Sequence, residues 1–186
     1  MHANQPAQSA TPMPERIVLT GFMGAGKSTV GRIVAERLGW EFVDLDDVIV
    51  EAAGKSIAAL FDSVGETAFR AQEHQALHSV LARPRMVLAL GGGAIETAAN
   101  RDLLQASAST RVVFLEAPLG TLLERCQQQQ AQPGAAARPV LADLENLLQR
   151  FTLRLPHYRT AHITVRTTGK DTASVADELL RQLQAV

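Results

Sequence analysis

The sequence predicts an α/β protein in which a mostly parallel sheet lies between two layers of helices. Short apolar runs rich in β-branched residues alternate with longer amphipathic segments, an order typical of parallel βαβ units. Several short runs are continuously apolar, as expected for strands covered on both faces. We expect strands at residues 17–20, 41–45, 86–90, 111–116 and 162–166. We expect helices at residues 27–38, 66–81, 97–106, 119–128, 143–159 and 171–184.

Length and composition limit the classes of protein to which the chain can belong. Its 186 residues suffice for one domain with a substantial core. The formal net charge is −1 and the basic residues are spread along the chain, which argues against nucleic acid or an anionic membrane as a partner. No apolar run approaches the roughly 20 residues that span a bilayer. The single cysteine, Cys126, excludes an internal disulfide framework and favours a reducing compartment.

The first 14 residues differ in composition from the rest of the chain. They are polar, contain proline and lack the apolar segment of a secretory signal. We therefore expect residues 1–14 to form a disordered tail. Residues 15–186 are expected to form a single domain, and the protein is expected in the cytoplasm.

The stretch GFMGAGKST, residues 21–29, has the spacing of a phosphate-binding loop. Gly21, Gly26, Lys27 and Ser28 satisfy G-x-x-x-x-G-K-[ST], between an expected strand and an expected helix. Glycines let backbone N–H groups turn towards phosphate oxygens, and the helix adds the positive end of its dipole. Lys27 would contact the β and γ phosphates, and the Ser28 hydroxyl would bind Mg²⁺. The loop predicts nucleotide binding but leaves open phosphoryl transfer, hydrolysis or binding alone.

Two carboxylates follow the second expected strand. On an extended strand Asp44 and Asp46 would point to the same side. The carboxyl ends of parallel strands line the ligand crevice, so these residues could help hold Mg²⁺ and orient or deprotonate a hydroxyl. The alternative is that Asp46 or Asp47 caps the next helix, and Asp47 is the better candidate for that role.

Three further patterns are weaker. Arg70 and Glu73 would be neighbours on a helix surface, a pair that is most often solvated and of little energetic value. The glycines at 91–93 follow an expected strand, and three in a row suggest backbone pressed close to a ligand. Pro156 lies inside a helical pattern and is expected to end or kink that helix just after Arg154.

The segment QQQQAQPGAAA, residues 127–137, is low in complexity and is followed by Arg138-Pro139. One interpretation is a flexible surface insertion. The other is part of a mobile lid over the nucleotide site, because a lid must be weakly packed in order to open. We place the expected lid at about residues 126–142.

Taken together, these patterns resemble the shikimate kinase family from about Arg16 to the C-terminus. The phosphate loop alone is common to many kinases, but its combination with the FRxxE and RxPxY patterns is specific. The matching motifs are GFMGAGKST, Asp44-Leu45-Asp46, the GExxFRxxE run at 65–73, Gly91-Gly92-Gly93, Arg138-Pro139 and Arg154-x-Pro156-x-Tyr158.

The resemblance implies a fold and an activity. The implied fold is that of nucleoside monophosphate kinases, a three-layer α/β/α arrangement around a five-stranded parallel sheet in the order 2-3-1-4-5, with a mobile lid. The implied activity is transfer of the γ-phosphoryl group of ATP to the 3-hydroxyl of shikimate, with Mg²⁺, in the pathway to aromatic amino acids. The family also implies a monomer.

Site residues follow from the same resemblance. Arg70 and Arg154 would hold the substrate carboxylate, for which a guanidinium offers a matching planar fork of donors. Asp46 would bind hydroxyls and serve as base, while Lys27 and Arg138 would stabilise the transferring phosphate. Metal contacts are implied for Ser28 and Asp44. Nucleotide contacts are implied for Gly24, Ala25, Gly26, Lys27, Ser28, Thr29, Arg125 and Arg138. Substrate contacts are implied for Asp46, Phe61, Phe69, Arg70, Glu73, Gly91, Gly92, Gly93 and Arg154.

Two alternatives stand beside this hypothesis. A gluconate-type or other carbohydrate kinase could share the loop; the pair of arginines disfavours a neutral sugar but leaves another small hydroxy acid open as substrate. A regulatory module that binds nucleotide or shikimate without turnover is disfavoured because Lys27, Asp46 and Arg138 are all present. The stretch between Arg125 and Arg138 is longer than is usual in the family. This departure concerns the closed geometry of the lid and the contact of Arg125 with adenine, and it leaves the core site unaffected.

Overall fold

The computed structural model describes residues 13–131 and 143–185. Most of the expected N-terminal tail lies outside these ranges; of its last two residues, Met13 is exposed and Pro14 is buried. Residues 132–142 of the expected lid, including Arg138, also lie outside the described residues.

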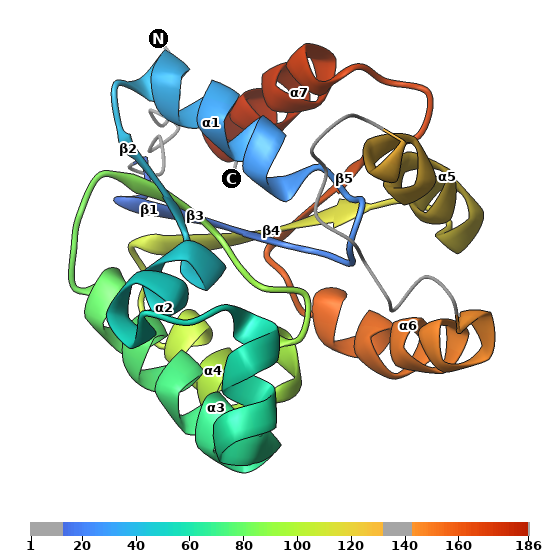
Figure 1. The fold of residues 1–186 in the computed structure, drawn as a ribbon. Helices are drawn as coiled ribbons and strands as arrows, with labels where there is room; N and C mark the ends of the chain where they lie inside the picture. The colour runs from blue at the N-terminus through green and yellow to red at the C-terminus, as the bar shows by residue number, and fades with distance from the viewer. Residues whose placement is uncertain (1–12, 132–142, 186) are drawn as a thin grey trace, which may run out of the picture.

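The described chain forms one twisted parallel sheet between helices (Figure 1). Its strands follow the order β2-β3-β1-β4-β5, and every neighbouring pair is parallel, which confirms the expected order. Four of the five residues of β1 and all four of β3 are buried, as their continuously apolar sequences predicted. The strands are β1 (Arg16–Thr20), β2 (Glu41–Asp44), β3 (Met86–Ala89), β4 (Thr110–Glu116) and β5 (Ile163–Arg166).

Helices cover both faces of this sheet, which confirms the three-layer architecture. Helices α1 and α7 lie on one face, and α3, α4 and α6 lie on the other (Figure 1). The apolar side chains between the layers form a continuous buried core. The helices are α1 (Lys27–Leu38), α2 (Leu45–Ala53), α3 (Ile57–Leu81), α4 (Ala98–Gln105), α5 (Leu119–Gln130), α6 (Leu144–Tyr158) and α7 (Thr172–Ala185), with a 3₁₀ turn, η1 (Ala94–Glu96).

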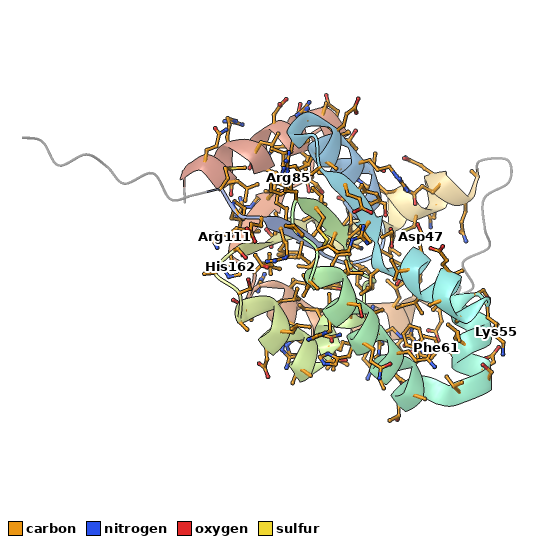
Figure 2. The ribbon with its side chains drawn as sticks, turned by 90° about the vertical axis from the view of Figure 1, so that its left-hand side faces the viewer. Asp47, Lys55, Phe61, Arg85, Arg111 and His162 are labelled. Atoms are coloured by element: carbon orange, nitrogen blue, oxygen red, sulfur yellow. The ribbon has the colours of Figure 1, made fainter. Side chains whose placement is uncertain are left out.

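The region after β2 differs from the expectation. Strand β2 ends at Asp44, and α2 begins at Leu45, because the Asp44 side chain accepts a hydrogen bond from the Asp46 N–H at 3.2 Å and so caps the helix. The assignment of the cap to Asp47 is therefore wrong. Asp47 is an exposed residue of the first turn of α2 (Figure 2).

Two further helix boundaries differ from the sequence prediction. Helix α3 begins at Ile57 rather than at residue 66, but it is kinked at Gly65, whose φ of 76° is outside the helical range. Helix α6 spans nearly the expected residues 143–159 and continues through Pro156 to Tyr158, so only the expected end after Arg154 is wrong. Pro156 is tolerated because it lies in the last turn, and the buried Tyr158 anchors that turn through a hydrogen bond to Gly92.

Candidate active site

The loop after β1 has the backbone geometry of an anion-binding cradle. Gly21, Gly24 and Gly26 have φ values of 145°, 76° and 90°, which other residues rarely adopt. Gly24 also packs closely against α5, since a Cβ there would lie 2.5 Å from the Leu122 carbonyl oxygen and 2.9 Å from Cys126 Sγ. Gly26 is the N-cap of α1 and no side chain caps the helix, so its first N–H groups face the loop and are suited to bind phosphate.

Lys27 and Ser28 extend from the start of α1 over this loop. The Lys27 ammonium donates hydrogen bonds to the carbonyl oxygens of Gly21, at 2.8 Å, and Phe22, at 3.1 Å. The Ser28 hydroxyl donates to Asp44 Oδ2 at 2.7 Å. The two residues expected at the metal are therefore in direct contact, although Ser28 belongs to α1 and Asp44 is the last residue of β2.

The oxygens of Ser28 and Asp44 fit the chemistry of Mg²⁺. This ion prefers oxygen ligands and usually keeps several waters, binding through one or two protein groups plus substrate phosphates. The described residues contain no group of three or more His, Cys, Asp or Glu side chains that could hold a metal by themselves. The Ser28 hydroxyl and the Asp44 carboxylate beside the phosphate loop would supply one or two ligands, and the nucleotide phosphates and waters would supply the rest.

Asp46 lies between Asp44 and Gly91, the first of the three glycines after β3. It is the second residue of α2, not a strand residue, so the expectation that Asp44 and Asp46 share one side of a strand is wrong. The hydrogen bond from the Asp46 N–H to Asp44 nevertheless holds the two together. A Cβ on Gly91 would overlap Asp46 Oδ1, so the carboxylate rests directly on the Gly91 backbone. Burial, and then the Asp44 charge, raise the pKa of Asp46.

Arg70, which is half-buried, and Glu73, which is buried, form an ion pair on α3. Arg70 Nη1 donates to both carboxylate oxygens of Glu73, at 3.1 and 2.9 Å, and Glu73 is only 1% exposed. The interpretation of this pair as a solvated surface contact is therefore wrong. Burial raises the pKa of Glu73 against the opposing charge of Arg70. The Arg70 guanidinium lies 5.8 and 5.5 Å from the rings of Phe61 and Phe69, which pack together at 4.3 Å.

Arg70 and Arg154 converge above the backbone of Gly93. A Cβ placed on Gly93 would lie 2.7 Å from Arg70 Nη2 and 3.2 Å from Arg154 Nη2. One at Gly92 would lie 3.6 Å from Arg154 Nη1 and 3.9 Å from the Gly21 carbonyl oxygen of the phosphate loop. The three glycines are thus explained by the charged side chains that approach their backbone. The Gly92 backbone thus lies between the Arg154 guanidinium and the Gly21 carbonyl of the phosphate loop.

Two residues that the sequence analysis gave no role complete this corner. Tyr158 donates a hydrogen bond to the Gly92 carbonyl oxygen at 2.6 Å, and burial raises its pKa. Glu96, in η1, accepts a hydrogen bond from Arg154 Nε. Tyr158 is the last residue of the RxPxY pattern, which is a signal for a role in the sequence itself. Nothing in the local sequence around Glu96 points to Arg154, which is 58 residues away.

The remaining expected nucleotide contacts are placed as follows. Ala25 is buried in the loop and Thr29 is an exposed residue of the first turn of α1. Arg125, on α5, donates to the hydroxyl and carbonyl oxygens of Thr167 at 2.9 and 2.8 Å, which holds it against the segment between β5 and α7. Arg138 lies outside the described residues.

The sheet order and the phosphate loop, with two guanidiniums and a buried carboxylate beside it, are those of a P-loop kinase of small molecules. The family model described as shikimate kinase matches residues 23–184. The chain belongs to the shikimate kinase family and, like its relatives, is an ATP-dependent phosphotransferase that uses Mg²⁺.

Individual relatives cover nearly the whole chain. A shikimate kinase from Halorhodospira halophila is 43% identical over 92% of this chain and 94% of the relative. One from Streptomyces avermitilis is also 43% identical, over 91% and 95%. Among solved structures, a shikimate kinase from Acinetobacter baumannii in complex with shikimate is 36% identical, covers 93% of this chain and 94% of that chain, and superposes with a TM-score of 0.80.

Proposed function

We propose that this kinase transfers the γ-phosphoryl group of ATP to the 3-hydroxyl of shikimate, giving shikimate 3-phosphate and ADP. The observation that carries the proposal is the convergence of Arg70 and Arg154 above Gly93, beside Asp46 and next to the phosphate loop. Two guanidiniums are suited to a carboxylate, and a carboxylate base is suited to a hydroxyl. Shikimate contains both groups on one small ring.

In the proposed complex the substrate carboxylate binds Arg70 and Arg154, and the ring lies near Phe61 and Phe69. Glu73 fixes Arg70 through its two hydrogen bonds. The glycines at 91–93 have no side chains, so Asp46, Arg70 and Arg154 lie directly against their backbone, beside which the acid would bind. Holding the acceptor by its far end aligns the hydroxyl with the phosphate loop, and alignment of this kind supplies much of the rate of a phosphoryl transfer.

Asp46 is the proposed general base. As the bond from the substrate oxygen to the γ-phosphorus forms and the bond to ADP breaks, the hydroxyl proton passes to an Asp46 oxygen. Burial and the Asp44 charge raise the pKa of Asp46, which makes it a stronger proton acceptor than an exposed aspartate.

Lys27 and the α1 N-terminus would hold the phosphates in the same complex. Mg²⁺, bound through Ser28 and Asp44 together with the phosphates, would neutralise developing charge. Arg125 is proposed to contact adenine. Arg138 is proposed to contact the transferring phosphate, a role that rests on the resemblance alone.

A coupled assay of ADP release tests the proposal against shikimate, quinate, gluconate and nucleoside monophosphates. We expect turnover that requires both shikimate and Mg²⁺. ATP hydrolysis that is independent of shikimate, or a preference for gluconate, would contradict it.

The proposal extends to the state and location of the enzyme. We propose a monomer, as the resemblance implies, and light scattering after size-exclusion chromatography tests it. We propose a cytoplasmic location, which the single cysteine favours. Among the described helices none is long and apolar enough to cross a membrane.

A further inference from the structure

Glu96 occupies one edge of the Arg154 guanidinium. Its carboxylate accepts from Nε, while the two terminal nitrogens of Arg154 lie over Gly92 and Gly93. A guanidinium has two edges that can bind a carboxylate, one formed by Nε and a terminal nitrogen and one formed by both terminal nitrogens. Contact with Glu96 at Nε leaves the second edge directed towards the corner that Arg70 also faces.

The backbone that carries Glu96 is held firmly by helix α4. Asn100, which is fully buried, donates to the Ala94 carbonyl oxygen at 2.8 Å, and its own oxygen lies 2.7 Å from His74 Nδ1. Arg101 Nη1 donates to the carbonyl oxygens of Ile95, at 2.9 Å, and Glu96, at 2.7 Å. All three carbonyls of η1 are therefore bound by α4, which fixes the backbone from which the Glu96 side chain reaches Arg154.

Charge balance gives this contact a second effect. The Arg70 and Arg154 guanidiniums approach one point above Gly93, so they repel each other unless each is compensated. Arg70 is paired with Glu73 and with Glu66. Glu96 supplies the matching carboxylate for Arg154. With both guanidiniums compensated, the pair can stand ready before the substrate arrives, which reduces the ordering cost of binding.

We infer that Glu96 is a positioning residue for substrate binding, which holds Arg154 by Nε so that its terminal nitrogens face the substrate carboxylate. It does not touch the substrate and acts only through Arg154. The inference rests on the proposed role of Arg154 as a carboxylate ligand.

Three substitutions at this position separate orientation from charge. Glu96→Ala removes both the acceptor and the charge, and we expect the KM for shikimate to rise about tenfold with kcat changed less than about threefold. Glu96→Gln keeps an oxygen for Nε–H without the charge, and we expect it to recover most of the lost affinity. Glu96→Asp has a shorter side chain, and we expect a KM close to that of Glu96→Ala. An unchanged or lowered KM in Glu96→Ala would overturn the inference, as would a Glu96→Gln variant as impaired as Glu96→Ala.

A double-mutant cycle with Arg154→Ala distinguishes failure of this inference from failure of the proposed site. We expect Glu96→Ala to have no further effect on KM in the Arg154→Ala background. An Arg154→Ala variant with the wild-type KM would contradict the carboxylate site itself. A raised KM in Arg154→Ala beside a wild-type KM in Glu96→Ala would contradict only the role of Glu96. Glu41→Ala is the matched control, because it breaks a Glu–Arg ion pair with Arg83 at the opposite end of the sheet, and we expect wild-type kinetics.

Discussion

The hydroxyl of Tyr158 donates a hydrogen bond to the carbonyl oxygen of Gly92 at 2.6 Å, across 66 residues of sequence. It joins the last turn of α6, which also carries Arg154, to the glycines that follow β3. Tyr158 is fully buried and stacks on Phe114 with ring centroids 5.3 Å apart. The same contact therefore fixes a helix end and one wall of the site.

Tyr158→Phe tests this link. The ring packing is kept, but the Gly92 carbonyl loses its partner, so we expect the free energy of unfolding to fall by about 1–3 kcal/mol. We also expect a raised KM for shikimate, because Arg154 stands one helical turn away. Urea denaturation and steady-state kinetics measure the two effects. A variant as stable as the wild type, with the same KM, would contradict the role of the hydrogen bond.

Gly91→Ala tests the contact between the Gly91 backbone and Asp46. The added methyl group would overlap Asp46 Oδ1, so the carboxylate must move, and we expect kcat to fall about a hundredfold. Gly120→Ala is the matched control, because a Cβ at that position in α5 meets nothing within 4 Å. We expect Gly120→Ala to keep wild-type activity and to gain about 0.5–1 kcal/mol of stability. Equal kcat in the two variants would count against the placement of Asp46.

Ser28→Ala tests the magnesium site. Loss of the hydroxyl removes one oxygen of the pair that Ser28 forms with Asp44, so we expect the Mg²⁺ concentration for half-maximal activity to rise about tenfold. Ser107→Ala is the control, since Ser107 bonds to Ser109 and Arg16 at the other end of the sheet. An unchanged Mg²⁺ dependence in Ser28→Ala would exclude Ser28 as a ligand.

His162 provides a pH-dependent contribution to stability. Its Nδ1 accepts a hydrogen bond from the Val112 N–H at 3.0 Å, and it lies beside Arg111 (Figure 2). Burial, and then the Arg111 charge, lower the pKa of His162 from 6.5. The unfolded chain therefore takes up a proton first, so the contribution is complete above pH 6.5 and is lost as the pH falls through the lower pKa of the folded state.

Urea denaturation across this pH range, in the wild type and in His162→Asn, measures that contribution. Asparagine keeps an acceptor for the Val112 N–H but does not titrate. We expect the wild type to lose stability relative to the variant as the pH falls below 6.5. A difference between the two proteins that stays constant with pH would contradict the prediction.

The central strands β1, β3 and β4 could be predicted from sequence because they are short, rich in apolar residues and mostly buried. The loop at residues 21–29 could be predicted because its spacing reflects a backbone requirement. Helix α2 was missed because one side chain, Asp44, ends the strand and caps the helix at once. The first part of α3 was missed because Gly65, whose backbone is not helical, interrupts the helix just before residue 66.

The site was partly predictable for a similar reason. Motifs indicated which residues take part, but the contacts among them join segments far apart in the chain. The approach of Arg70 and Arg154 above Gly93, and the contact of Glu96 with Arg154, depend on how α3, η1 and α6 pack. The burial of Glu73 likewise follows from packing and not from its spacing to Arg70.

In the proposed complex, Arg70 and Arg154 bind the carboxylate of shikimate. Isothermal titration of the wild type with shikimate and with its methyl ester tests this most directly, since the ester keeps the ring and hydroxyls but has no charge. We predict that the ester binds at least about a hundredfold more weakly, and that Arg154→Ala removes much of that difference. Equal affinity of the wild type for the acid and the ester would contradict the account.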